Sequence, residues 1–439
     1  MADQRVQDSS SVIARELSSL VGAQFVNIEP NAYETLDGRP NEVVVVEPNS
    51  EDEVARILQL AHASGWTVSP TGAGTQTGFG NVPNSVQLVV KSTRMNGILE
   101  YSPSDLVVTT QPGTPLCELQ QVLRQHGQMF PIDPVCQPNA TVGGILETGV
   151  TGPLRTMYGT LRDLTIGLRS VYPNGEVVKA GGKVVKNVAG YDMTKLFIGS
   201  LGTLVFVTEV TVKLRPLPVH TELCLLAGSA DQVGRVTAQI IDSHLIPSRM
   251  EALHGAYEGL GDVGRWALAV ESHENPTAAA YQSSALKRLA DENGLTYQVL
   301  QGNDAEEFWQ SYRSTAAATD LCVRYSVPPN RALALSNEAL SFLPGTSKNA
   351  YFSVTPAAGV ARVFASGMSV EDEVIFVTNL RTVVARYGGT VVIENGSVGL
   401  RQRVDAFGAA GSGFVIHQRI KEAIDPQHIM NPGRFLGGI

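Results

Sequence analysis

The sequence has few of the residues from which metal centres and disulfide frameworks are built. Its 439 residues include only four cysteines, which form no CxxC pair and lie far apart at Cys117, Cys136, Cys224 and Cys322. The eight histidines are scattered as well, without a His-x-His or HExxH pattern. Zinc and iron–sulfur ligands come in closely spaced groups. We therefore expect reduced structural thiols and no metal site.

Long apolar runs and an excess of basic residues are also missing. Nothing approaches the eighteen apolar residues expected of a transmembrane helix, and the first ten residues lack the charged-then-apolar order of a signal peptide. The formal net charge of −9 argues against nucleic acid as a partner, because phosphates bind basic surfaces. We expect a cytoplasmic protein, peripheral to the inner membrane only if partners hold it there.

Glycine, by contrast, is abundant, with 43 residues, which favours a loop-rich α+β or α/β fold over a helical bundle. Up to Leu214, β-branched runs typical of strands are separated by Gly and Pro, and amphipathic spacing predicts helices at 11–21, 51–63 and 116–126. Beyond Pro216-Leu217-Pro218, strand and helix patterns alternate, with helices expected at 231–244, 278–293, 305–317 and 372–387. The proline cluster indicates a domain boundary.

One glycine-rich segment reads Pro70-Thr71-Gly72-Ala73-Gly74-Thr75-Gln76-Thr77-Gly78-Phe79-Gly80. Consecutive small residues allow left-handed backbone conformations, which can point several N–H groups at one anion. The GxGxxxG spacing differs from a Rossmann fingerprint, and a strand pattern follows where a Rossmann loop must open a helix. Taken alone, the segment is as compatible with a plain turn between strands as with a phosphate-binding loop.

Further motifs follow this loop in order. They are Pro131-Ile132-Asp133-Pro134, Ala140-Thr141-Val142-Gly143-Gly144, Tyr158-Gly159, Pro173-Asn174-Gly175, Gly190-Tyr191-Asp192, Gly199-Ser200-Leu201-Gly202-Thr203-Leu204 and Glu209-Val210. With them, residues 38–218 resemble the FAD-binding domain of the vanillyl-alcohol-oxidase (PCMH-type) superfamily, although Thr71 and Ala73 replace its usual Arg-Gly. The resemblance implies an α+β fold with a two-subdomain FAD-binding domain at 1–218 (core 38–218). It also implies an α+β cap domain at 219–384 and a C-terminal segment, 385–439, that packs back on the FAD domain.

The resemblance also implies which residues hold FAD between the loop and the later motifs. They are Pro70, Thr71, Gly72, Ala73, Gly74, Thr75, Gln76, Pro134, Ala140, Thr141, Gly143, Gly144, Gly149, Tyr191, Gly199, Gly202, Thr203 and Val207. The family sometimes attaches its flavin to a histidine or cysteine. Since residues 70–80 contain neither, we expect non-covalent FAD, with Cys136 as the one residue that could contradict this.

Three segments are similar to one branch of the superfamily, the smaller flavoprotein subunit of bacterial glycolate oxidase. They are Thr151-Gly152-Pro153-Leu154-Arg155, the run from Gly182 to Asp192, and the tail from Ile424 to Arg434. This similarity implies a small 2-hydroxy acid as substrate. It also implies two partners, a sister flavoprotein and an iron–sulfur subunit.

Oxidation of a 2-hydroxy acid needs a cation for the carboxylate and a base for the hydroxyl proton. Arg313 matches a position where the family often places its carboxylate-binding arginine, Arg324 matches a neighbouring basic position, and a guanidinium suits that role. In Val391-Val392-Ile393-Glu394-Asn395-Gly396, however, Asn395 stands where catalytic members of this branch carry a metal-binding histidine. An amide neither deprotonates near neutral pH nor binds a divalent cation well. Glu394, with a pKa raised by burial, is a candidate base, and Tyr191 and Lys186 are alternatives.

Two hypotheses therefore stand side by side. In the first, the chain is itself an FAD-dependent oxidoreductase acting on a small hydroxy acid such as glycolate or D-lactate through a modified base. In the second, it is an FAD-carrying or electron-relaying subunit of a glycolate-oxidase-like complex, in which a sister flavoprotein oxidises the substrate. The missing metal histidines and clustered cysteines favour the second hypothesis.

Overall fold

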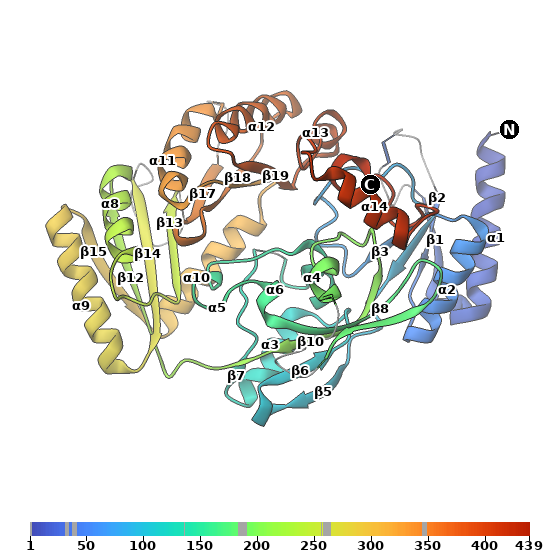
Figure 1. Ribbon diagram of the computed structural model, residues 1–439, viewed down its shortest axis with the longest axis horizontal. Helices are drawn as coiled ribbons and strands as arrows, with labels where there is room; N and C mark the ends of the chain where they lie inside the picture. Colours follow the sequence, from blue (N-terminus) through green and yellow to red (C-terminus); the bar gives the residue numbers. More distant parts are fainter. Residues whose placement is uncertain are drawn as a thin grey trace.

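The computed structural model describes residues 2–30, 35–36, 42–135, 137–182, 191–255, 257, 265–344 and 349–439, and only the backbone of residues 2–9 and 349. Its fold is α+β, with two small sheets in the N-terminal half and one large sheet in the C-terminal half (Figure 1). Cys136, and residues 183–190 of the run from Gly182 to Asp192, which include Lys186, lie outside the described residues. None of the described helices is long and apolar enough to cross a membrane.

The first sheet has the strand order β1-β2-β4-β3 (Val26–Pro30, Glu42–Val46, Leu88–Lys91 and Val68–Thr71). Helices α1 (Ala2–Val21) and α2 (Glu51–Ser64) share its core. The sequence sets the bounds of α2 locally, because the Ser50 side chain accepts a hydrogen bond from the Glu53 N–H and Gly65 ends the helix at φ 69°. Parallel pairing of β3 with β4 places the glycine-rich loop, which follows Thr71, at one end of this sheet.

The second sheet is antiparallel, in the order β5-β6-β10-β8-β9 (Ile98–Ser102, Val107–Thr110, Phe206–Lys213, Thr165–Val171 and Val177–Gly181). A two-stranded ribbon, β7 (Gln128–Met129) with β11 (Arg215–Pro216), lies beside it. Helices α3 (Leu116–Gln125), α4 (Val142–Thr148), α5 (Arg155–Tyr158), α6 (Leu161–Leu164) and α7 (Met193–Phe197) connect these strands. The apolar side chains of α3, α4 and β10 form one core.

The third sheet is antiparallel, in the order β15-β12-β14-β13-β17-β18-β16-β19 (Thr296–Gln301, His220–Gly228, Trp266–Glu274, Arg249–His254, Asn349–Thr355, Val360–Ser366, Leu321–Ser326 and Thr390–Asn395). One face packs on α8 (Ala230–Ile241), α9 (Pro276–Asn293), α11 (Pro329–Ala339) and α12 (Val370–Ala385). The opposite face packs on α10 (Asn303–Ala317). α11 was not predicted from the sequence pattern; it begins at Pro329, the second of two consecutive prolines.

After β19, helices α13 (Val398–Arg403) and α14 (Phe414–Ile424) lead to the last segment of the chain. This segment lies against the first sheet, where Met430 forms a parallel bridge with Val68 and the Val68 N–H donates to the Ile429 carbonyl at 2.7 Å. The predicted boundaries at 218/219 and 384/385 stay predictions. β19 belongs to the third sheet, so the return to the first sheet is made by residues beyond Asn395.

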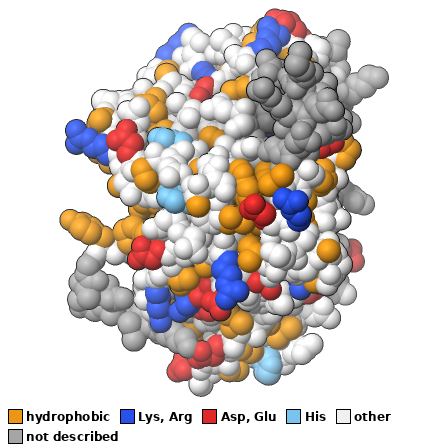
Figure 2. All heavy atoms as spheres, turned by 90° about the vertical axis from the view of Figure 1, so that its right-hand side faces the viewer, with side chains coloured by type: hydrophobic (Ala, Val, Ile, Leu, Met, Phe, Trp, Pro, Cys, Tyr) orange, Lys and Arg blue, Asp and Glu red, His pale blue; other side chains and the backbone are white. Residues whose placement is uncertain are grey.

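In Figure 2 the molecule is turned so that the right-hand side of Figure 1 faces the viewer. On this face, acidic, basic and apolar side chains are interspersed. That side of the molecule carries α1 and α2. The mixture agrees with the low net charge per residue of the sequence. A continuous basic surface of the kind that binds nucleic acid is not visible among the described residues of this face.

Candidate functional site

Two adjoining hollows lie where the glycine-rich loop meets the other parts of the molecule. The first, here the glycine hollow, is lined by residues 69–77, by Thr141, Gly144, Glu147 and Thr148, by Leu201 and Gly202, and by Asn431 and Arg434. The second, the arginine hollow, is lined from the loop side by Thr75, Gln76 and Phe79 and from the third sheet by Cys322, Arg362, Phe364, Glu394 and Asn395. Both include Thr75 and Gln76, so one ligand can extend from the first hollow into the second.

Two glycines of the glycine hollow lie so close to neighbouring side chains that an added Cβ atom would crowd them. A Cβ at Gly72 would lie 2.1 Å from Thr141 Oγ1, and one at Gly202 would lie 3.1 Å from Asn431 Nδ2. Gly74 has φ 74° and nothing within 4 Å of its Cβ position, so its backbone borders open space. Gln76 is held in place by the Thr148 hydroxyl, which donates to its Oε1 at 2.6 Å.

A segment from far along the chain completes the glycine hollow. The Asn431 N–H donates to the Val68 carbonyl at 2.8 Å, and Asn431 Nδ2 donates to the Leu201 carbonyl at 2.7 Å. Arg434 Nη2 donates to the Thr77 carbonyl at 2.7 Å. Behind this segment, the buried Lys421 ammonium contacts the Asp425 carboxylate at 2.7 Å and donates to the Thr203 and Met430 carbonyls. These contacts fix the last segment against the loop.

The charged side chains at the arginine hollow come from three neighbouring strands, in which successive side chains point to opposite faces of the sheet. In β16 and β18, residues 321, 323, 325, 361, 363 and 365 point to the helix-covered core, so Arg324 and Arg362 point to the opposite face. These two arginines are directly paired across the strands, an unfavourable arrangement for like charges. Glu394 of β19 compensates it, with Oε1 2.7 Å from Arg324 Nε and Oε2 2.7 Å from Arg362 Nε.

A third arginine reaches this cluster from the N-terminal half. Arg155 of α5 donates through Nη1 to Thr151 Oγ1 at 3.2 Å, and Thr151 lines the arginine hollow. Burial, together with the positive charges of Arg362 and Arg324, lowers the pKa of the Arg155 guanidinium. Three arginines therefore lie near one ionised carboxylate, and an anion placed among them would be stabilised.

Two family models match the chain at these places. The model of an FAD binding domain matches residues 43–181, and the model of the C-terminal domain of FAD-linked oxidases matches residues 360–435. The first range holds the glycine-rich loop and α4, and the second holds Arg362, Glu394 and the Asn431–Arg434 segment. Both matches are consistent with membership of the PCMH-type superfamily of FAD-linked oxidases.

Curated relatives and solved structures agree with this membership. The chain is 37% identical over 211 residues to glycolate oxidase subunit GlcD of Bacillus subtilis, covering 48% of this chain and 45% of the relative. It is 42% identical over 123 residues to glycolate oxidase subunit GlcE of Escherichia coli, covering 28% and 35%. The matched segments thus span less than half of either relative. The solved structure of p-cresol methylhydroxylase covers 97% of this chain and 96% of its own length at TM-score 0.74 and 15% identity, which shows a shared fold.

FAD is the cofactor of this family member, and the glycine hollow fits its dinucleotide. Glycines without room for a Cβ at Gly72 and Gly202, and open space at Gly74, suit close approach of a backbone to a phosphate. The predicted cofactor residues that line the glycine hollow are Pro70, Thr71, Gly72, Ala73, Gly74, Thr75, Gln76, Thr141, Gly144 and Gly202. Their contact with FAD stays a prediction, because the structure holds the protein chain alone.

The other predicted cofactor residues line neither hollow. Pro134 and Ala140 are buried, and Gly143 lies under Pro112. Gly149 and Gly199 lie back to back, since a Cβ on Gly149 would be 3.5 Å from Gly199 Cα. Thr203 and Val207 are buried, with Val207 inside β10. Tyr191 is 96% exposed. These positions support the shape of the site rather than its lining.

The predicted catalytic residues have different surroundings. Arg313 of α10 lies 3.3 Å from Glu306 Oε1 and does not line the arginine hollow. Arg324 is paired with Glu394. Burial would raise the pKa of Glu394, but Arg362 and Arg324 hold it below its ordinary value. The expected rise in the pKa of Glu394 was therefore wrong, because two guanidiniums stabilise the charged form.

Sequence reasoning missed Arg362, Arg155 and Glu147. Arg362 stands inside an otherwise apolar strand run, Val360-Ala361-Arg362-Val363-Phe364, and a charge in such a run is a signal of a functional position. Arg155 belongs to a motif that was used only for the resemblance. Among the described residues, no group of three or more His, Cys, Asp or Glu side chains is arranged to hold a metal ion.

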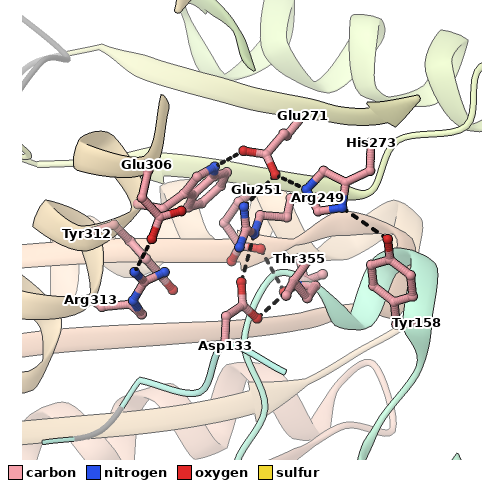
Figure 3. Close-up of polar contacts among 12 residues, drawn as sticks. Asp133, Tyr158, Arg249, Glu251, Glu271, His273, Glu306, Tyr312, Arg313 and Thr355 are labelled. Carbon is pink, nitrogen blue, oxygen red and sulfur yellow. Dashed lines mark hydrogen bonds and ion pairs between the residues drawn. The ribbon is translucent and has the colours of Figure 1, made fainter. Parts of the chain in front are cut away.

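A polar network beside the arginine hollow joins the two halves of the molecule (Figure 3). From the N-terminal half, Asp133 Oδ2 accepts from Arg249 Nε at 2.9 Å, and the Tyr158 hydroxyl lies 3.0 Å from His273 Nδ1. Within the third sheet, Glu271 contacts Arg249, and its Oε1 lies 2.6 Å from His273 Nε2. All five side chains are at least half-buried, so the network fixes how the sheet faces the FAD domain.

Proposed function

We propose that this chain carries FAD for the oxidation of a small 2-hydroxy acid and works beside a sister flavoprotein. One observation carries the proposal: among the described residues, the hollow next to the glycine hollow is lined by Arg362 and by Glu394, whose carboxylate is paired with Arg362 and Arg324, and Arg155 lies near them. The names of the GlcD and GlcE relatives, both subunits of glycolate oxidase, support the substrate class and the existence of a partner.

The arginines account for binding of a carboxylate. Arg155, Arg324 and Arg362 bring three positive charges, and Glu394 neutralises one of them. Arg362 is buried, and its bond to Glu394 holds the guanidinium in one orientation. A small hydroxy acid entering beside Thr151 would meet the Arg155 guanidinium first, and this contact would orient the carboxylate toward the loop side of the hollow.

The same hollow lacks a group that accepts the hydroxyl proton. When bound, FAD accepts the two electrons and the hydrogen that leave the α-carbon of such an acid. The lowered pKa of Glu394 makes it a weak base, and burial raises the pKa of the Cys322 thiol well above its ordinary value. Asn395 donates through Nδ2 to the Thr319 and Asp320 carbonyls and cannot take up a proton. The proton acceptor is therefore supplied by a partner in this proposal.

A second candidate function is a stand-alone oxidoreductase. It is favoured by the completeness of the architecture, because one chain supplies both the FAD hollow and the sheet that faces it, as in the solved p-cresol methylhydroxylase. In that case a water molecule would have to accept the hydroxyl proton in place of a side-chain base.

An anaerobic reduction experiment separates the two functions. The purified chain with its FAD is mixed with glycolate or D-lactate, and the flavin absorbance is followed with and without the sister flavoprotein and an iron–sulfur subunit. Under the proposal, the absorbance of the chain alone is unchanged and that of the assembled complex is bleached. Bleaching of the chain alone at the rate of the complex supports the stand-alone enzyme instead. Cytoplasmic location and the iron–sulfur partner are part of the proposal.

A further inference from the structure

Glu147 is a buried carboxyl group that neither the fold nor the proposed chemistry accounts for. It lies on α4, lines the glycine hollow and is half-buried. Its Oε2 accepts from the Ser200 hydroxyl at 2.7 Å and from the Gly202 N–H at 2.9 Å. Its Oε1 is buried and has no hydrogen-bond partner in the described part of the chain. An unpaired buried carboxyl oxygen is costly unless a ligand or a proton satisfies it.

Among the described residues, no cation is bonded to Glu147. Loop residues 69–77 and the 199–203 turn contain no ionisable side chain. The last segment contributes Arg434, which donates to the Thr77 carbonyl, and the ion pair of Lys421 with Asp425 behind it. The described hydrogen bonds of the carboxyl group come from two neutral donors, the Ser200 hydroxyl and the Gly202 N–H. Consistent with this, burial raises the pKa of Glu147 to about 7.

A second buried oxygen atom in the glycine hollow also lacks a hydrogen-bond partner among the described residues. Asn431 Oδ1 is buried without a partner among the described residues, and the bond from Nδ2 to the Leu201 carbonyl fixes which side of the amide it occupies. The two oxygens differ in what can satisfy them. An amide oxygen can only accept a hydrogen bond, so Asn431 Oδ1 needs a donor such as a hydroxyl group of the ligand, whereas Glu147 Oε1 can carry a proton itself.

We propose that FAD binds to this chain with Glu147 as the neutral carboxylic acid, so that binding of the cofactor takes up one proton. The pyrophosphate of FAD is a dianion, and a second anion at Glu147 in the same low-dielectric hollow would repel it. A neutral acid removes this repulsion and can donate through Oε1, which the protein leaves unpartnered. The inference concerns cofactor binding only and does not depend on the proposed substrate or on a partner.

The proposal predicts a pH-dependent affinity for FAD. Free protein loses the proton of Glu147 above about pH 7, whereas the FAD-bound protein keeps it. The dissociation constant of FAD should be constant below that pH and rise about tenfold for each pH unit above it. At pH 8.5 the affinity should be about thirtyfold weaker than at pH 6.

The test measures release of FAD from the purified holoprotein upon dilution, by the fluorescence of the freed cofactor, from pH 6 to pH 9. In parallel, a weakly buffered indicator dye counts the protons released with FAD at pH 8.5. Wild type should release about one proton and show the pH slope. Glu147→Gln, which keeps a neutral side chain at every pH, should bind FAD with no slope, and Glu118→Gln on the exposed side of α3 should behave like wild type.

Two results would overturn the proposal. One is wild type that releases no proton with FAD and holds it equally at pH 6 and pH 8.5, which would mean that an ionised Glu147 accepts a hydroxyl of the cofactor. The other is a Glu147→Gln variant with the wild-type slope, which would place the titrating group elsewhere. If Glu147→Gln does not fold, the proton count on wild type decides alone.

Discussion

The glycine hollow and the arginine hollow touch at Thr75 and Gln76 but are made in opposite ways. The glycine hollow is formed mainly by backbone and small neutral side chains from contiguous stretches, and its shape depends on missing Cβ atoms. The arginine hollow is lined from three strands of the third sheet, and its charged part, Arg362 and Glu394, depends on ion pairs. A binding site made of backbone is altered by adding side-chain volume, whereas a site made of charged side chains is altered by removing one of the charges.

The largest effect is expected in the charged cluster. Glu394→Gln would leave Arg324 and Arg362 paired across neighbouring strands without a counter-charge. Loss of one partner of a buried ion pair costs about 3–5 kcal/mol, so we expect the free energy of unfolding in urea to fall by about that amount. The double variant Arg362→Met/Glu394→Met is the matched control, because replacing both partners by apolar groups costs much less.

The pH dependence of stability sharpens the same point. The pKa of Glu394 is lower in the folded chain than its ordinary value, so its stabilising contribution is present above pH 4.5 and is lost as the pH falls through the folded pKa. In urea unfolding below pH 4.5, wild type should lose stability more steeply than Glu394→Gln. Equal slopes would show that the arginines do not hold the carboxylate ionised.

The glycine hollow should respond to volume rather than charge. In Gly72→Ala the new Cβ would approach Thr141 Oγ1, the residue that caps α4. Overpacking of this kind costs about 1–3 kcal/mol, so the dissociation constant of FAD should rise about 10- to 100-fold. Gly182→Ala, where the Cβ position is open, is the control and should bind FAD normally. Normal FAD binding by Gly72→Ala would remove the loop from the cofactor site.

A variant of Arg155 tests whether carboxylate binding in the arginine hollow can be weakened without changing FAD binding in the glycine hollow. Arg155→Gln should weaken binding of oxalate, a carboxylate without an oxidisable α-hydrogen, by about 10- to 100-fold, since a hydrogen bond to a charged group is worth about 1.5–3 kcal/mol. FAD affinity should be unchanged. The readout is the shift of the flavin spectrum during titration with oxalate. Arg288→Gln, at a side chain that is 73% exposed, serves as the control, and an equal loss in both variants would exclude a site at Arg155.

The smallest effect is expected in the network of Figure 3. Tyr158→Phe removes one hydrogen bond to His273 between the two halves and should lower the free energy of unfolding by about 1 kcal/mol. Tyr281→Phe, on the exposed side of α9, should change it by less. Unaltered flavin absorbance in Tyr158→Phe would agree with a purely structural role. A loss of FAD would show that the network also shapes the cofactor site.

The sequence predicted the glycine hollow better than the arginine hollow, for a physical reason. A phosphate loop is a local object, so Gly72, Gly74 and their neighbours could be assigned from one contiguous motif. That Gly202 and Thr141 lie close to the cofactor was inferred from the family resemblance and not from the spacing of residues in the sequence. Glu147, Asn431 and Arg434 could not be assigned to the hollow, because their place depends on the fold of the last segment against Val68 and Thr77.

The arginine hollow depends on strand pairing that no local pattern reveals. Arg324 and Glu394 were predicted as catalytic residues, which stays a prediction, and their mutual pairing reverses the expected pKa of Glu394. Arg362 acquires its role only because β18 pairs with β16 in a register that sets it opposite Arg324. Arg313 was assigned from its motif, yet α10 carries it away from the lining of the hollow.

The contact of Asn431 and Arg434 with the glycine-rich loop has a consequence for how this flavoprotein is made. The loop leaves the ribosome more than 350 residues of synthesis before Arg434 does. A nascent chain can fold the first two sheets early, but the wall formed by Asn431 is absent until translation has passed that codon. Cofactor loading is thus a late event in biogenesis, and partly translated chains would stay flavin-poor whatever the cellular supply of FAD.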